Sequence, residues 1–146
     1  MTARRTPRVH QAWLLLCATF AIHIADEAFT GFLDLWNPTI RNMRQHTPWL
    51  ILPTFTFPVW ISLLALAVIG FLILSHWIGR DLRWTVYACY AFAAIMSANA
   101  IAHLGFSVYK SQWMSGSYTS PLVLAASIYL LIRTSHDHRE WWIPGG

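Results

Sequence analysis

The chain has 146 residues, of which 56% are hydrophobic and only 11% are charged. Soluble domains carry about 25% charged residues, so this composition excludes an ordinary water-soluble globule. The formal net charge is +4, but the basic residues are few and lie scattered between apolar runs, which argues against nucleic acid as a partner. The expected partner is the lipid bilayer.

Four apolar runs each approach the roughly 20 residues that a helix needs to cross a bilayer. The predicted fold is all-α: a polytopic membrane protein in which a single domain, residues 1–146, forms a four-transmembrane-helix bundle. The helices are expected over about residues 12–35, 50–75, 84–109 and 120–132.

Prolines mark several of the expected boundaries. Asn37-Pro38 should end the first helix, because proline cannot continue the hydrogen-bond ladder. Pro53 and Pro58 should kink the second helix, with either a simple bend or a widened pocket beside it. Ser120-Pro121 should open the fourth helix, with a hydroxyl at the N-cap and proline in the first turn. That helix is short for a full crossing, so residues 115–119 are expected to dip below the membrane surface.

The basic residues predict an orientation, because positive loops stay in the cytoplasm. With four crossings, seven of the ten Lys and Arg residues lie on the side that holds both termini: Arg4, Arg5, Arg8, Arg80, Arg83, Arg133 and Arg139. The remaining three are Arg41, Arg44 and Lys110. The pattern predicts an integral protein of a bacterial inner membrane with both termini in the cytoplasm.

The first apolar run contains His23, Asp26 and Glu27. An acid at the centre of a spanning helix costs roughly 2.5–3.5 kcal/mol on insertion scales, so these groups need partners. His23 and Glu27 are four residues apart and share a helix face, while Asp26 lies on its flank. The third run repeats this spacing with Asn99 and His103.

These polar groups are expected at one level of the bundle. At 1.5 Å per residue, Glu27 and Asn99 lie equally deep in their helices, and His103 lies one turn further. Thr56 and the start of the fourth helix should reach the same layer. The N-terminus of that helix would favour a nearby carboxylate, so the sequence predicts one shared polar site.

Three interpretations of this site remain open. In the first, His23, Glu27 and His103 bind a divalent metal such as zinc or iron, with Asp26 or Asn99 as a further ligand or as support. In the second, Glu27, Asp26 and His103 act as general acid and base without a metal. In the third, a buried ion-pair network locks the first helix to the third, although two adjacent acids exceed what one lock requires.

The spacing His23-x-x-Asp26-Glu27, near the start of a small four-helix membrane protein, resembles the HXXEE family, which is named for a histidine followed by two acids at this spacing. Asn99-x-x-x-His103 and the Gly-Ser-Tyr-Thr-Ser-Pro segment, residues 116–121, are similar to the second half of its pattern. The chain departs from the pattern at Asp26, whose side chain reaches less far than glutamate. The resemblance implies a metal-binding or catalytic role.

The leading functional hypothesis is a membrane enzyme, metal-dependent or acid–base, that acts on a lipophilic small molecule; its reaction could be a hydrolysis, an isomerisation or an oxidoreduction. The alternatives are a proton- or ion-coupled carrier or channel component, which with four helices would need a homo-oligomer, and a structural subunit of a larger membrane complex. Intramembrane acids and histidines also mark ion paths. Tyr118, near the expected mouth of the site, could donate a hydrogen bond, but packing is the more common role.

Overall fold

A computed structural model describes residues 7–47, 49, 51–78, 80 and 83–140, without the side chains of Pro7 and residues 137–140. The described chain is all-helical, as the composition predicts, and contains no strand. It has five helices where four were expected: α1 (Pro7–Phe29), α2 (Phe32–His46), α3 (Phe57–Leu74), α4 (Arg83–Lys110) and α5 (Ser120–Glu140).

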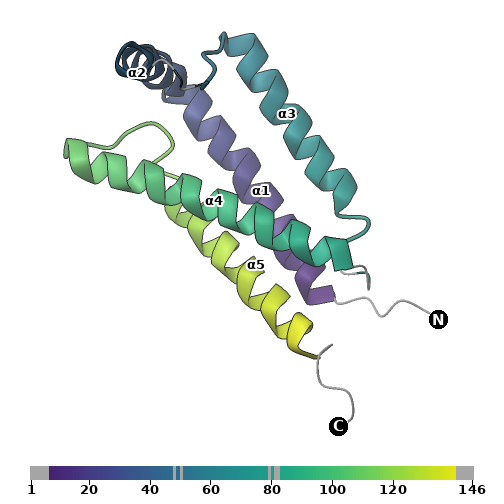
Figure 1. Cartoon of the computed structure of the whole chain (residues 1–146). Helices are drawn as coiled ribbons and strands as arrows, with labels where there is room; N and C mark the ends of the chain where they lie inside the picture. Colours follow the sequence, from purple (N-terminus) through teal and green to yellow (C-terminus); the bar gives the residue numbers. More distant parts are fainter. Residues whose placement is uncertain (1–6, 48, 50, 79, 81–82, 141–146) are drawn as a thin grey trace.

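The helices form an elongated bundle with α2 placed across one end (Figure 1). Helix α1 packs against α3 on one side and against α5 on the other, and α5 packs closely along α4. The two ends of the described chain lie together at the end of the bundle remote from α2. The loops that precede α3 and α5 therefore both lie near α2.

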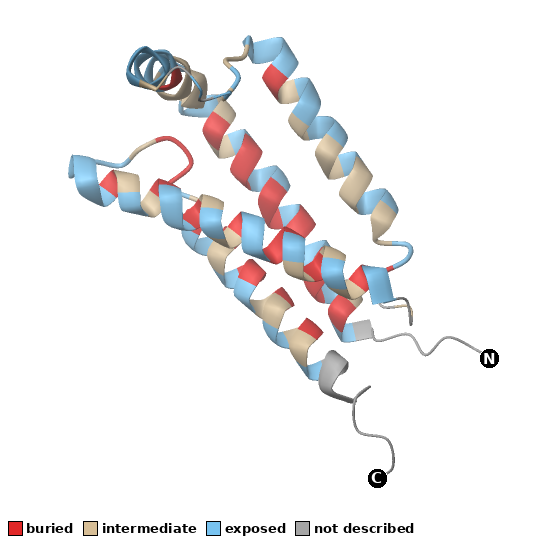
Figure 2. Ribbon diagram, viewed as in Figure 1, coloured by how far each residue is buried: buried red, intermediate tan, exposed pale blue. Residues whose placement is uncertain are grey.

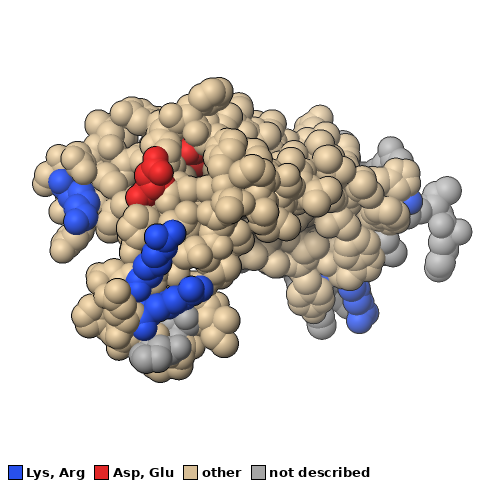
Figure 3. All heavy atoms as spheres, turned by 90° about the horizontal axis from the view of Figure 1, so that it is seen from above, with Lys and Arg blue, Asp and Glu red and all other residues tan. Residues whose placement is uncertain are grey.

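Among the residues that the structure describes, three helices are long and apolar enough to cross a membrane: Arg8–Phe29, Phe57–Leu74 and Arg83–Lys110. In α3 only 6% of the apolar stretch is buried inside the protein, so most of its side chains face outward (Figure 2). Viewed from above, the surface is mainly uncharged, with Lys and Arg at a few places (Figure 3). An outward apolar surface of this kind suits contact with lipid chains.

The hydrophobic core lies along α1, on the faces that meet α3, α4 and α5. Three aromatic residues pack together in and against this core: the ring centroids of Trp13 and Phe92 lie 4.9 Å apart, and those of Phe92 and the partly buried Phe71 lie 4.1 Å apart. The indole N–H of Trp13 donates to the carbonyl oxygen of Phe71 at 2.9 Å, which satisfies a buried donor. This packing fixes α1 against its neighbours below the polar layer.

The predicted first helix, residues 12–35, is wrong at its C-terminal end. Helix α1 ends at Phe29, and Gly31 adopts φ +75°, a left-handed conformation that suits glycine. The chain then turns into α2, which contains Pro38. Proline removes one helical hydrogen bond, to the carbonyl of Asp34 four residues earlier, and Asp34 is exposed. Pro38 therefore does not end the helix, and the residues after it remain helical as far as His46.

The predicted kink in the second helix is also wrong. Helix α3 begins at Phe57, so Pro58 occupies its first turn, where no N–H is needed. Residues 51–56 are irregular. Asn37 supports them, because its side-chain amide donates to the Phe55 carbonyl at 2.9 Å and accepts from the Phe55 N–H at 3.0 Å. The prediction of a helix from residue 50 fails because Pro53 lies in the irregular segment before the helix and Pro58 lies in its first turn.

The other two predictions agree better with the structure. Helix α4 matches the predicted 84–109 within one residue at each end. Helix α5 begins at Ser120 as expected, but it continues to Glu140 and does not end near residue 132. The polar residues from Arg133 onward end the apolar run without ending the helix.

Candidate metal centre

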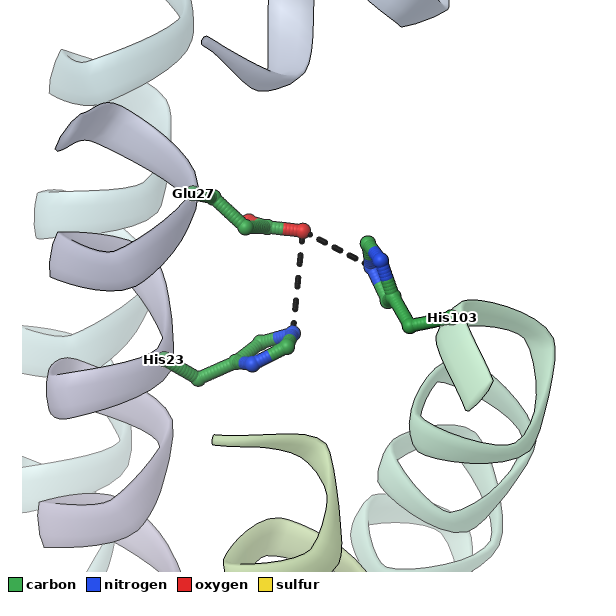
Figure 4. A group of neighbouring side chains, drawn as sticks. All are labelled: His23, Glu27 and His103. Carbon is green, nitrogen blue, oxygen red and sulfur yellow. Dashed lines mark ion pairs between the residues drawn. The ribbon is translucent and has the colours of Figure 1, made fainter. Parts of the chain in front are cut away.

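His23 and Glu27 on α1 meet His103 on α4 inside the protein, two residues before α1 ends (Figure 4). The Glu27 Oε1 atom lies 2.9 Å from His103 Nε2 and 3.6 Å from His23 Nε2. All three residues are buried, with His23 completely so. One atom from each side chain thus points to a common centre, and no two of these atoms are more than 4.8 Å apart.

The backbone of the turn before α5 orients the His103 ring. His103 Nδ1 lies 2.7 Å from the carbonyl oxygen of Ser115. A carbonyl oxygen can only accept, so the proton is on Nδ1. In the neutral imidazole, Nε2 then carries the lone pair, and Nε2 is the atom that faces Glu27. Metal-binding histidines are commonly held in this way, with the other ring nitrogen donating to a carbonyl or carboxylate.

The His23 ring is oriented by a carboxylate acting through a hydroxyl. The Thr119 hydroxyl donates to Oδ2 of Asp26 at 2.9 Å, because an ionised carboxylate can only accept. The same hydroxyl lies 2.8 Å from His23 Nδ1, so it accepts the Nδ1 proton. The lone pair of His23 is therefore on Nε2 as well, and it also points toward Glu27.

Asn99 and Asp26 take different positions around the three-residue centre. The Asn99 side-chain nitrogen lies 2.9 Å from His23 Nε2 and donates to its lone pair. Asp26 does not join the centre. It is only half-buried, and its Oδ2 also accepts from the backbone N–H of Thr119 at 3.1 Å, just before the first turn of α5. The expectation that the start of this helix would hold a carboxylate is met by Asp26.

The turn that closes the site depends on Gly116. This residue has φ +78°, and a Cβ atom built on it would lie 2.7 Å from Cε1 and Nδ1 of His103 and 3.1 Å from Cε1 of His23. The turn is held to α4 through hydroxyl groups: Ser107 contacts Ser117, and Ser117 donates to the His103 carbonyl at 3.2 Å. Backbone without a side chain therefore covers both imidazoles.

A pocket of about 240 Å³ opens beside the centre, between α2 and α4. Asn99 and His103 line it together with apolar side chains from both helices. Phe32 of α2 packs over His103, with ring centroids 5.7 Å apart. The residues that line the pocket are Phe32, Leu35, Trp36, Thr39, Asn99, Ala102, His103 and Phe106. One end of a small molecule bound in this pocket would contact Asn99 and His103.

The structure thus places the predicted residues in three groups. His23, Glu27 and His103 come together, Asn99 contacts His23, and Asp26 acts one step away through Thr119. Two further residues named from the sequence lie elsewhere. Thr56 is exposed at the N-cap of α3, and Tyr118 is exposed and stacks on Trp113 at 5.4 Å between ring centroids.

Sequence reasoning missed three contributors from the turn before α5. The Thr119 hydroxyl, the Ser115 carbonyl and the bare Gly116 backbone all touch the histidines. Ser-Gly-Ser sequences are common in turns and carry no sign of a site. Two signals drew attention to this turn: the short apolar length of the fourth run, which predicted that residues 115–119 dip below the membrane surface, and the family resemblance of residues 116–121.

The donor set fits a transition-metal ion. Zinc binds histidine nitrogen and carboxylate oxygen at about 2.0–2.2 Å, so two ligands of a tetrahedral ion are separated by about 3.3 Å. The observed 2.9 Å and 3.6 Å between Glu27 and the two imidazoles bracket that spacing. Two histidines and one carboxylate also leave positions free for water or substrate.

Comparison of the chain with protein-family models, curated proteins and solved structures finds no match.

Proposed function

We propose that this protein is a small integral membrane enzyme in which His23, Glu27 and His103 bind a catalytic divalent metal, zinc or iron, and act on a lipophilic small molecule. The observation that carries the proposal is the convergence of two imidazole Nε2 atoms and one carboxylate oxygen within 4.8 Å. Both Nδ1 protons are already committed to other acceptors. The lone pair of His103 Nε2 thus faces Glu27, and that of His23 Nε2 becomes available to a metal when the hydrogen bond from Asn99 is given up.

A metal held by these ligands would supply a Lewis acid and would lower the pKa of a water molecule that it binds. The protein itself holds the ligands in place. Asp26, acting through Thr119, and the Ser115 carbonyl fix the two rings. Phe32 and the turn at Gly116 cover the centre, so its chemistry takes place in a largely water-free environment.

Acid–base catalysis without a metal is the second candidate. The 2.9 Å contact between Glu27 Oε1 and His103 Nε2 favours it, because a proton can be shared between these atoms. His103 also lines the pocket, where it can exchange a proton with a substrate. This candidate uses the same residues and the same substrate position.

The surroundings of the centre favour an enzyme over a carrier. In the described part of the chain, no acid or histidine is buried apart from His23, Glu27 and His103. Toward the end that holds the termini, the core is formed mainly by Trp13, Leu16, Phe20, Phe92 and Met96. Intramembrane proton paths use chains of titratable residues, and here the polar layer is followed by hydrophobic packing.

The proposal includes four membrane crossings, with α5 as the fourth, both termini in the cytoplasm of a bacterium and α2 at the opposite surface. The seven basic residues on the side of the termini support this orientation. We also propose membership of the HXXEE family, on the basis of His23-x-x-Asp26-Glu27 and of Asn99-x-x-x-His103. In that case Asp26 serves the family's first acidic position from outside the metal centre.

Metal analysis of the purified protein tests the proposal. Wild-type protein should carry close to one equivalent of zinc or iron, and the combined His23→Ala, Glu27→Ala, His103→Ala variant should carry almost none. The matched control combines His46→Ala with Asp34→Asn, which removes an exposed histidine and an exposed acid from α2. Equal, near-zero metal in wild type and triple variant after metal loading would eliminate the metal mechanism.

A further inference from the structure

We infer that the substrate is a neutral, carbonyl-bearing lipophilic molecule, smaller than a membrane lipid, which enters from the bilayer between α2 and α4 and whose carbonyl oxygen accepts a hydrogen bond from Asn99. The inference rests on the proposed function, because it defines the substrate of the same centre. Its basis is the pocket bounded by Phe32, Leu35, Ala102 and Phe106, with Asn99 and His103 at its polar end.

The size of the pocket limits the substrate. Its volume of about 240 Å³ is below the roughly 300–1,000 Å³ of pockets that hold drug-sized ligands. An intact phospholipid does not fit. The pocket lies between α2 and α4 rather than in the interior of the bundle, and Ala102 is exposed. A molecule dissolved in the membrane can therefore reach it sideways.

The walls of the pocket select an apolar body. Three aromatic residues, Phe32, Trp36 and Phe106, line it. The Thr39 hydroxyl also lies at the lining, but it donates to the Leu35 carbonyl at 2.7 Å. An ionised head group passing these walls would lose its hydration without a partner. A neutral polar group passes at much lower cost.

Asn99 determines which functional group of the substrate lies beside the metal ligands. Its side-chain nitrogen carries two N–H groups, and the hydrogen bonds of the described residues use only one of them, to His23 Nε2. The other is available to a ligand in the pocket that Asn99 lines. A carbonyl oxygen accepts such a bond, and it is also the group that a neighbouring Lewis acid polarises. Asn99 thus brings a carbonyl beside the metal ligands.

Photolabelling with benzophenone tests this inference. Benzophenone is a small diaryl ketone that reacts with nearby C–H bonds on irradiation, and its adducts can be mapped by mass spectrometry on the full-length protein in detergent. We expect adducts concentrated on the pocket residues of α2 and α4. Diphenylmethane, which has the same rings without the carbonyl, should compete about 2- to 10-fold more weakly than unlabelled benzophenone, the size of one hydrogen bond.

Variants that fill the pocket provide the control. Ala102→Phe and Leu35→Trp narrow it from α4 and from α2, and each should abolish site-directed labelling. Ala94→Phe adds the same ring at an exposed position of α4 outside the pocket, and it should leave labelling unchanged. Adducts spread evenly over the outward faces, including α3, and insensitive to both filling variants would overturn the inference, as would equal competition by diphenylmethane.

Zinc content measured on the same samples separates the two proposals. Metal bound without directed labelling contradicts the substrate inference and leaves the metal centre standing. Labelling directed to the pocket in protein without metal supports substrate binding between α2 and α4 and contradicts the metal mechanism.

Discussion

Oε1 of Glu27 lies 2.9 Å from Nε2 of His103, and this contact joins α1 to α4 inside the protein. The His103 Nδ1 proton is held by the Ser115 carbonyl, so the two facing atoms both carry lone pairs unless a proton or a metal lies between them. A buried carboxylate without such a partner would be strongly destabilising. The contact therefore requires a cation, and the identity of that cation decides the chemistry.

The first prediction concerns Glu27→Gln. Glutamine keeps the shape of the side chain, and its amide can donate to the lone pair of His103, so the fold should persist. The charge that binds the metal is lost, so zinc affinity should fall by more than the roughly 10–100-fold typical of changes to supporting residues. Competition with a chelator of known affinity measures this. Asp34→Asn is the control and should bind zinc as wild type does; unchanged affinity in Glu27→Gln would remove Glu27 from the ligand set.

The second prediction concerns Thr119, the link between Asp26 and His23. Thr119→Val keeps the volume but removes the hydroxyl, so the His23 tautomer is no longer fixed. Zinc affinity should fall roughly 10–100-fold, and Thr119→Ser should restore most of it because serine keeps the hydroxyl. Asp26→Asn should weaken binding through the same link, so its effect should not add to that of Thr119→Val. Full additivity would show that Asp26 acts on the centre by another route.

The central site was predictable because it depends on helical spacing. Four residues separate His23 from Glu27 and Asn99 from His103, and such pairs share a face wherever the helix begins or ends. Errors in the helix boundaries therefore did not move them. The depth of Glu27 was predicted less well, because this residue lies in the last turn of α1 and not within a helix that continues to residue 35.

The turn and α2 were not predictable for two physical reasons. Pro38 predicts a helix end, but the loss of one backbone hydrogen bond does not prevent α2, a helix of 15 residues, from forming around it. The turn at residues 115–119 contributes a carbonyl and a bare Cα, and backbone groups leave no trace in residue type. Only the three-dimensional structure shows that Gly116 lies against both imidazoles.

The third prediction uses Gly116. Alanine here must adopt φ +78°, which costs about 1–2 kcal/mol, and its Cβ would lie 2.7 Å from the His103 ring. Gly116→Ala should lower the free energy of unfolding by at least that amount and displace His103, with loss of zinc binding. Gly105→Ala is the control: nothing lies within 4 Å of its Cβ position in α4, so it should stabilise the helix by about 0.5–1 kcal/mol. Denaturation in detergent and zinc titration measure both variants.

Retained zinc binding and normal stability in Gly116→Ala would mean that the turn moves away from the histidines without consequence. The support that Ser115 gives to His103 would then be dispensable.

The fourth prediction concerns the orientation of the bundle in the membrane. Asn42 is exposed on α2 and His136 is exposed on α5, at opposite ends of the protein. With both termini in the cytoplasm, Asn42→Cys should react with a membrane-impermeant maleimide on intact spheroplasts, whereas His136→Cys should react only after permeabilisation. Cys17 and Cys89 are buried and should add little background. The reverse labelling pattern would mean that the protein has the opposite orientation in the membrane. Labelling of both positions from one side would mean that α5 does not cross the bilayer.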